Sequence, residues 1–75
     1  MMNELVITIK NGMGSAVINE QRYESKGSDG SRQAIINSLE MRWIVENNQD
    51  SFNDSGNLKP NAEIIRPNIT INDED

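Results

Sequence analysis

Hydrophobic and polar residues alternate over residues 4–10, ELVITIK, with a period of two that is typical of a half-buried β-strand. Residues 15–23, SAVINEQRY, also alternate and are expected to return antiparallel to the first strand. The connection is either a two-residue turn at Asn11-Gly12 or a four-residue loop over 11–14, and both registers keep the same faces together. The predicted core face of this hairpin consists of five apolar residues, Leu5, Ile7, Ile9, Ala16 and Ile18.

The stretch NGMGS between these two segments has the two-glycine spacing with which many phosphate-binding loops begin. A dinucleotide-binding loop continues into a helix and carries a third glycine, whereas here an alternating segment follows and the third position is Val17. No Gly-Lys-Ser/Thr sequence follows either, so the phosphate-loop pattern fails. Asn-Gly between alternating segments instead predicts a hairpin turn.

A helix is predicted over residues 32–47, RQAIINSLEMRWIVEN, after the Ser- and Gly-rich loop 24–31. Asp29 and Ser31 are both good candidates for the N-cap of this helix. A projection of about 100° per residue places four apolar residues on one arc, Ile35, Ile36, Leu39 and Trp43. This arc is expected to pack on the core face of the hairpin.

A second apolar row lies on nearly the opposite side of the predicted helix, with Ile44 on a flank between the two rows. This second row consists of Ala34, Met41 and Val45. A one-sided surface helix does not need a second row. Either residues 58–71 fold back and cover the row, or it meets a partner protein or a second copy of the chain.

The C-terminal residues 62–72, AEIIRPNITIN, are typical of a strand that is interrupted at Pro67. Proline has no N–H to donate, so the segment is predicted to be an edge strand or two short pieces. The acidic tail 73–75 is expected to be frayed. The whole chain, residues 1–75, is therefore predicted to be one α+β domain of ββαβ order. This order is similar to the opening of many small α+β folds, including the ubiquitin-like β-grasp, and implies no function.

The composition restricts the possible chemistry. The chain has 75 residues and contains no His and no Cys, so it has no imidazole base, no thiolate nucleophile and no structural zinc ligands. Its carboxylates show no spacing that would bring a catalytic pair together on one helix face. The sequence therefore predicts neither an enzyme nor a cofactor or metal site. A chain this short builds a thin core, so association with itself or a partner is expected.

The charge restricts the possible partners. Twelve acidic and seven basic residues give a net charge of −5, which opposes binding to nucleic acid and to anionic membranes. No apolar run approaches the roughly 18 residues of a membrane span, and the N-terminus lacks the features of a signal peptide. A cytoplasmic location, in a bacterial or an infected host cell, is therefore expected.

These observations together favour a small acidic protein-binding module. Its expected partner is another protein with a basic surface, and a homodimer is also expected to be possible. Short acidic chains of this kind are similar in type to phage-encoded inhibitors of host nucleic-acid-handling proteins, including anti-CRISPR proteins. The alternatives are an assembly subunit that self-associates through its edge strand and second helix face, and a small nucleic-acid-binding regulator. The candidate partner-binding residues are Ala34, Glu40, Met41, Val45 and Glu46.

Overall fold

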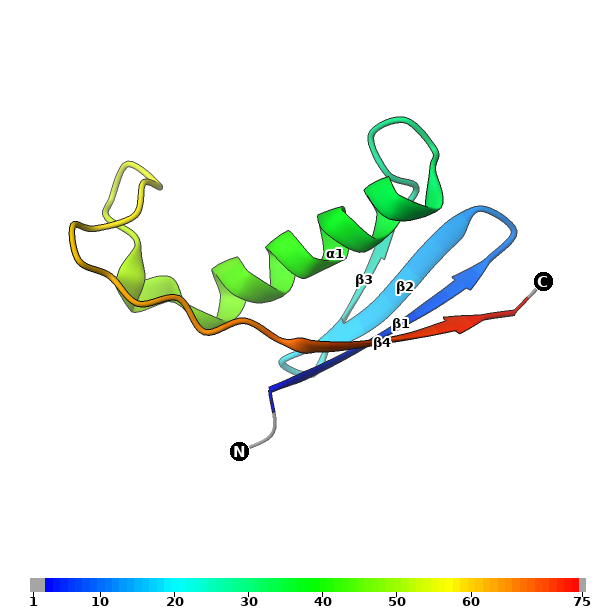
Figure 1. The fold of residues 1–75 in the computed structure, drawn as a ribbon, viewed down its shortest axis with the longest axis horizontal. Helices are drawn as coiled ribbons and strands as arrows, with labels where there is room; N and C mark the ends of the chain where they lie inside the picture. Colours follow the sequence, from blue (N-terminus) through cyan, green and yellow to red (C-terminus); the bar gives the residue numbers. More distant parts are fainter. Residues whose placement is uncertain (1–2, 75) are drawn as a thin grey trace.

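A computed structural model describes residues 3–74, which form a four-stranded sheet with one helix lying across one face (Figure 1). The elements are β1 (Glu4–Lys10), β2 (Met13–Ile18), β3 (Gln21–Ser25), α1 (Arg32–Asn47), the short 3₁₀ helix η1 (Gln49–Ser51) and β4 (Asn68–Asp73). The strand order is β3-β2-β1-β4, in which β4 runs parallel to β1 and the other neighbours are antiparallel. The predicted α+β class, with a hairpin, a packed helix and a C-terminal edge strand, is confirmed.

The first hairpin uses the shorter of the two predicted turns. Lys10 pairs with Met13, and the intervening Asn11 and Gly12 have φ angles of 52° and 75°. Two consecutive positive φ angles match the right-handed twist of the flanking strands, which is why Asn-Gly is favoured there. The predicted core face is confirmed, since all five of its residues are buried, Leu5, Ile7, Ile9, Ala16 and Ile18.

The predicted return strand over 15–23 is wrong in one respect, because the chain turns again at Asn19-Glu20. These two residues have φ angles of 50° and 71°, and they separate β2 from a third strand, β3. The turn shifts the alternation of faces by one residue, since Ala16 pairs with Tyr23 and Ile18 with Gln21. Asn19-Glu20 contains neither glycine nor proline and the residues after it are mostly polar, so the sequence pattern did not reveal the turn. The extra strand makes β3 one edge of the sheet, and β4 the other.

The helix begins and ends where the sequence predicts, and both N-cap candidates contribute to its start. The Ser31 hydroxyl accepts a hydrogen bond from the Ala34 N–H at 3.1 Å, which makes Ser31 the N-cap. Asp29 in turn accepts the Ser31 N–H at 2.9 Å. Hydrogen bonds from Ser31 lower the pKa of the Asp29 carboxyl, because they stabilise its charged form.

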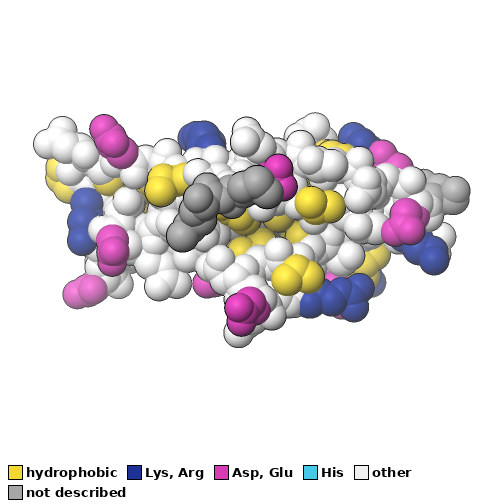
Figure 2. Space-filling view, turned by 90° about the horizontal axis from the view of Figure 1, so that it is seen from below, with side chains coloured by type: hydrophobic (Ala, Val, Ile, Leu, Met, Phe, Trp, Pro, Cys, Tyr) yellow, Lys and Arg dark blue, Asp and Glu magenta, His cyan; other side chains and the backbone are white. Residues whose placement is uncertain are grey.

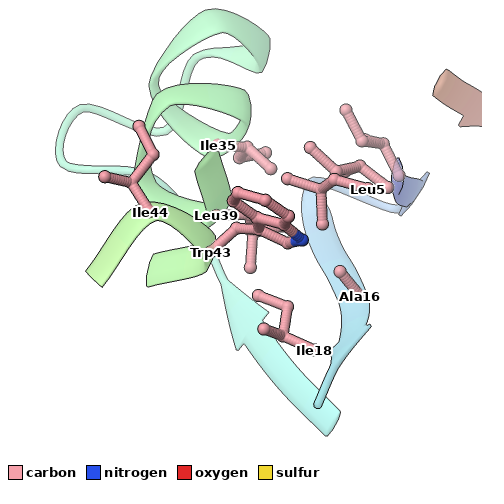
Figure 3. Packing of buried hydrophobic residues seen from close by; sticks show 9 residues of the cluster. Leu5, Ala16, Ile18, Ile35, Leu39, Trp43 and Ile44 are labelled. Atoms are coloured by element: carbon pink, nitrogen blue, oxygen red, sulfur yellow. The ribbon is translucent and has the colours of Figure 1, made fainter. Parts of the chain in front are cut away.

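The core lies between α1 and the sheet (Figure 3). Ile35, Leu39 and Trp43 are buried as predicted, whereas the fourth residue of the predicted arc, Ile36, is only half-buried. Ile44 was expected on a flank but is also buried, and it projects to a different side of α1 than Leu39 and Trp43 (Figure 3). The helix therefore buries a wider apolar stripe than the predicted arc.

The C-terminal segment forms a strand only after Pro67. The preceding residues 62–67 have no regular structure and run beneath the C-terminal end of α1 (Figure 1). The buried Asn48 side chain fixes them there, since it accepts the Ile65 N–H at 2.8 Å and donates to the Ile65 carbonyl at 2.9 Å. The N–H and C=O groups of Ile65 thus bond to the Asn48 side chain, whereas in a strand they would bond to a neighbouring strand.

The acidic tail was expected to be frayed, but the structure pairs its first two residues. Asp73 is the last residue of β4, and its carboxylate accepts two hydrogen bonds from the Arg32 guanidinium at 2.8 and 3.1 Å. The next residue, Glu74, donates its N–H to the Ile9 carbonyl at 2.8 Å. Asp75 lies outside the described residues. The tail is thus attached both to β1 and to the start of α1.

Gly14 on β2 is predicted to be required for the approach of α1 to the sheet. A Cβ atom at this position would overlap the Ile35 Cγ2 atom and press on Leu39 at 3.3 Å. We expect Gly14→Ala to lower the free energy of unfolding by about 1–3 kcal/mol, measured by urea denaturation. Ser15→Ala, next along the strand, should change it by less than about 0.5 kcal/mol. Equal stability of the two variants would contradict the packing of Ile35 against β2.

Candidate protein-binding surface

Two of the predicted site residues, Met41 and Val45, lie together in a shallow groove between α1 and the edge strand β3. The groove is lined by Tyr23, Glu24, Ser38, Leu39, Met41, Arg42 and Val45. Leu39 is buried, Val45 is half-buried and Met41 is 58% exposed. The second apolar row of the helix therefore forms one wall of an open groove, and β3 forms the other.

Of the two alternatives for the second row, the one in which residues 58–71 cover it is wrong. None of these residues lines the groove. The segment instead contacts the residues that follow α1, where the Lys59 N–H donates to the Ser51 carbonyl at 2.9 Å and the Asn48 side chain is hydrogen-bonded to the Ile65 backbone. The Met41 side of α1 is consequently left open among the residues that the structure describes.

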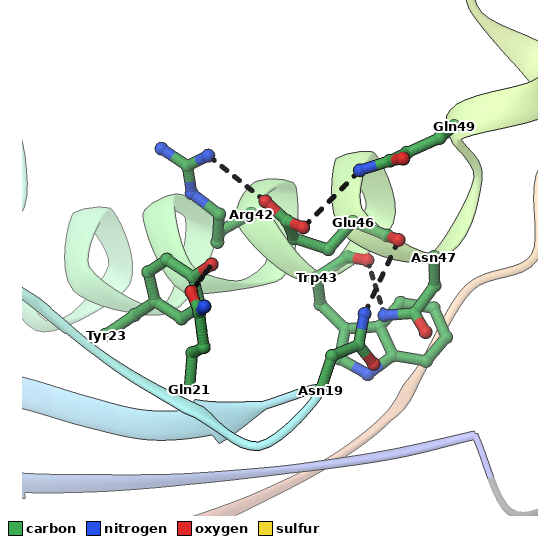
Figure 4. Close-up of polar contacts among 8 residues, drawn as sticks. All are labelled: Asn19, Gln21, Tyr23, Arg42, Trp43, Glu46, Asn47 and Gln49. Atoms are coloured by element: carbon green, nitrogen blue, oxygen red, sulfur yellow. Dashed lines mark hydrogen bonds and ion pairs between the residues drawn. The ribbon is translucent and has the colours of Figure 1, made fainter.

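Polar contacts join α1 to β3 at the end of the groove (Figure 4). The Arg42 guanidinium lies 5.3 Å from the centroid of the Tyr23 ring, at a distance suited to a cation–π contact. Arg42 also lies 3.6 Å from the Glu46 carboxylate, one turn further along the helix. Asn19, in the turn before β3, donates to the Glu46 carbonyl at 3.5 Å. Tyr23 and Arg42 are therefore held in position at the rim of the groove.

The other three predicted site residues do not line this groove. Ala34 lies near the start of α1, in a separate hollow whose lining includes Ser31 and Asn37. Glu46 contacts Arg42 and lines a hollow at the end of the helix. Glu40 is half-buried and lies on another side of α1, since six residues separate it from Glu46. The predicted set is thus divided over three sides of the helix.

The sequence interpretation missed the edge strand β3 as part of this surface. Arg22 and Glu24 of β3 lie on the open face of the sheet, opposite to α1, and their side chains approach within 3.6 Å. Tyr23 between them faces the helix side and packs against the core. The alternation of QRYES separates Tyr23 from Arg22 and Glu24, but the unpredicted turn at Asn19-Glu20 decides which of the two sides faces α1 and places β3 at the edge of the sheet.

Most arginines of the described chain lie beside carboxylates. Arg22 pairs with Glu24, Arg42 with Glu46, and Arg32 with Asp73. The Arg32 hydrogen bonds lower the pKa of Asp73, and the same contact raises the pKa of Arg32. On the face seen in Figure 2, acidic and basic side chains are interspersed, with hydrophobic side chains between them. This arrangement differs from the basic stripe of a nucleic-acid-binding surface.

Among residues 3–74, no three Asp or Glu side chains are placed to hold a metal ion together. No helix in this range is long and apolar enough to cross a bilayer. A scan against protein-family models and searches of curated proteins and of solved structures gave no significant match. The function is therefore inferred from the groove, the sheet edges and the charges.

Proposed function

We propose that this chain is a cytosolic, non-enzymatic module that binds protein through the groove between α1 and β3. The observation that carries this proposal is Met41, a large hydrophobic side chain that is 58% exposed above the buried Leu39. A flexible thioether side chain adapts to the shape of a partner, and its transfer from water favours association. Val45 extends the apolar wall along the helix.

The surroundings of the groove support a protein partner. An apolar centre with a polar rim is common in protein interfaces, in which Tyr, Met and Arg are enriched. Here Tyr23 and Arg42 stand at the rim and are held by their mutual contact. The adjacent edge strand β3 adds backbone N–H and C=O groups that an extended segment of a partner can pair with.

Photo-crosslinking from the groove tests this proposal. A photoreactive amino acid at position 41 should form adducts with protein, in solutions of the pure chain or in extracts of its source cells. Leu58 is the matched control site, because it is hydrophobic, 53% exposed and outside the groove. Excess unlabelled protein should suppress the adducts, whereas excess Met41→Glu variant should not. Equal adduct formation from positions 41 and 58 would contradict the proposal.

The acidic character of the chain supports a more specific form of the proposal, an inhibitor that occupies the basic surface of a nucleic-acid-handling host protein. Anti-CRISPR proteins exemplify this type. The last turn of α1 has no basic side chain and includes Glu46, although the helix dipole favours cations at that end. Glu46, Asp50 and Glu63 line the hollow there. This end of the molecule is therefore suited to a cationic partner surface.

Charge reversal tests the inhibitor proposal. Asp50→Lys and Glu63→Lys together should weaken binding to the crosslinked partner about tenfold or more, because both carboxylates line the same hollow and two attractions become repulsions. Isothermal titration calorimetry measures the affinity, and circular dichroism checks that the fold is retained. Glu4→Lys is the matched control, since Glu4 is an exposed glutamate on β1. If binding survives the double reversal, the partner does not recognise this acidic surface.

A second candidate function is assembly through β4, the other edge of the sheet. The N–H groups of Asn68 and Glu74 donate to the carbonyls of Asn3 and Ile9, so the N–H groups of Ile69 and Ile71, at the alternate positions, are directed away from β1. These two side chains are half-buried and apolar, which suits a strand that continues a sheet. Nucleic-acid binding has less support, because three arginines already pair with carboxylates.

A further inference from the structure

We infer that a second copy of this chain occupies the groove, with β3 pairing antiparallel to β3 of the second copy about a two-fold axis at Tyr23. The inference rests on the proposed function, in which the α1–β3 side binds protein, and it identifies the partner. The two four-stranded sheets then form one continuous sheet with both helices on the same side. An isologous contact of this kind closes on itself and therefore stops at two copies.

The backbone of β3 is suited to this pairing. The turn at Asn19-Glu20 joins Ile18 and Gln21, which face each other across the hairpin. In a two-residue hairpin this pair is hydrogen-bonded, so the alternation leaves Arg22 and Glu24 with N–H and C=O groups directed away from β2. When the two-fold axis passes through Tyr23, the backbone N–H and C=O groups of Arg22 in each copy form hydrogen bonds with those of Glu24 in the other copy.

The charges of β3 are self-complementary in the same register. Arg22 and Glu24 lie on the open face of the sheet and are 66% and 52% exposed at their side chains. Pairing about Tyr23 places Arg22 directly opposite Glu24 of the second copy, and Glu24 opposite its Arg22. Glu20, in the turn before β3, and Lys26, just after β3, carry opposite charges at the two ends of the same register. Opposite charges that face each other across a strand pair are stabilising.

Other registers lack this complementarity. A shift of two residues in one direction places Arg22 opposite Arg22 of the second copy. A shift of two residues in the other direction places Glu24 opposite Glu24 of the second copy. Like charges directly opposite each other are destabilising, so both shifts are disfavoured. A shift of one residue fails because only every second residue directs its backbone groups outward. The alternating charges of EQRYESK thus select one pairing.

The helix side of the contact covers the groove. Tyr23 meets Tyr23 of the second copy in a non-hydrogen-bonded pair, in which side chains are closest and aromatic pairs are favourable. The walls of the two grooves then face each other across the axis, so that Met41 and Val45 approach their counterparts. This contact removes the exposed part of Met41 from water.

The edge strand β4 has no comparable complementarity. Its sequence NITIND contains Asp73 as its one charged residue, and it contains neither Lys nor Arg. Arg32 already neutralises Asp73 through two hydrogen bonds. Self-pairing of β4 therefore has no charge pattern that selects a register, which favours β3 as the edge that joins two copies.

Exchange of complementary charges tests this inference by sedimentation equilibrium. Arg22→Glu and Glu24→Arg should each weaken self-association about tenfold or more, because two attractions per dimer become repulsions. An equimolar mixture of the two variants should dimerise again, since the carboxylate introduced at position 22 of one chain then faces the guanidinium introduced at position 24 of the other. The contact within each chain stays broken in the mixture, so only pairing between chains explains recovery.

A control separates this recovery from general electrostatic attraction. Glu4→Arg changes the net charge as Glu24→Arg does but lies on β1, so its mixture with Arg22→Glu should not recover. Failure of the Arg22→Glu and Glu24→Arg mixture to recover would overturn the inference. Loss of the dimer in Ile69→Lys, with the β3 variants unaffected, would overturn it in favour of assembly through β4.

The remaining outcomes distinguish the inference from the function on which it rests. If the wild-type chain stays monomeric up to about 1 mM, the inference is overturned. The proposed function then stands only if position 41 crosslinks to a different protein. If position 41 forms no adducts beyond those of the position 58 control, both are overturned. A dimer that crosslinks through position 41 and recovers in the variant mixture supports both.

Discussion

The close contact between Ile35 of α1 and β2 at Gly14 determines how the helix lies on the sheet. Only a residue without a side chain lets the helix approach there, because a Cβ atom would overlap the Ile35 side chain. This contact places α1 over the inner strands, where Leu39 and Trp43 complete the core. One helix cannot cover four strands, so the β3 side keeps an open groove. The position of the groove is thus a consequence of core packing.

The proposed binding surface combines two features that serve protein recognition elsewhere. The wall formed by α1 offers apolar side chains, Met41 and Val45, while β3 offers the backbone groups of an edge strand. A small chain without disulfides or a zinc site gains most from association, because its own core is thin. Pairing of two β3 strands would extend the sheet and cover the apolar wall in one contact. The alternating charges of β3 select one pairing register, whereas an edge strand without charged side chains would not specify one.

Local patterns predicted much of this fold, and the failures have identifiable causes. The hairpin face around Ile7 and the helix after Ser31 follow from periodicity and capping chemistry, which act within a few residues. The turn at Asn19-Glu20 was missed because it contains neither glycine nor proline and the strand after it is mostly polar, although it shifts the alternation of faces by one residue. The strand expected from residue 62 begins only at Asn68, since Asn48 takes the backbone bonds of Ile65. That last contact joins distant residues, which local patterns do not reveal.

The candidate site was predicted in part for the same reason. Met41 and Val45 are one turn apart and stay together, whereas Glu40 and Glu46 point to different sides of the helix. Tyr23 joins the surface only through the fold, because the second hairpin brings β3 beside α1. Helical periodicity therefore identified one wall of the groove and had no information on the other.

Hydrogen–deuterium exchange of the wild-type chain at several concentrations tests the central claim most directly. The claim is that β3 is the edge through which two copies associate. The outward amides of Arg22 and Glu24 should exchange rapidly in dilute solution and become protected as concentration rises. Those of Ile69 and Ile71 on β4 should not change. Protection of the β4 amides alone, or no concentration dependence at β3, would contradict the account.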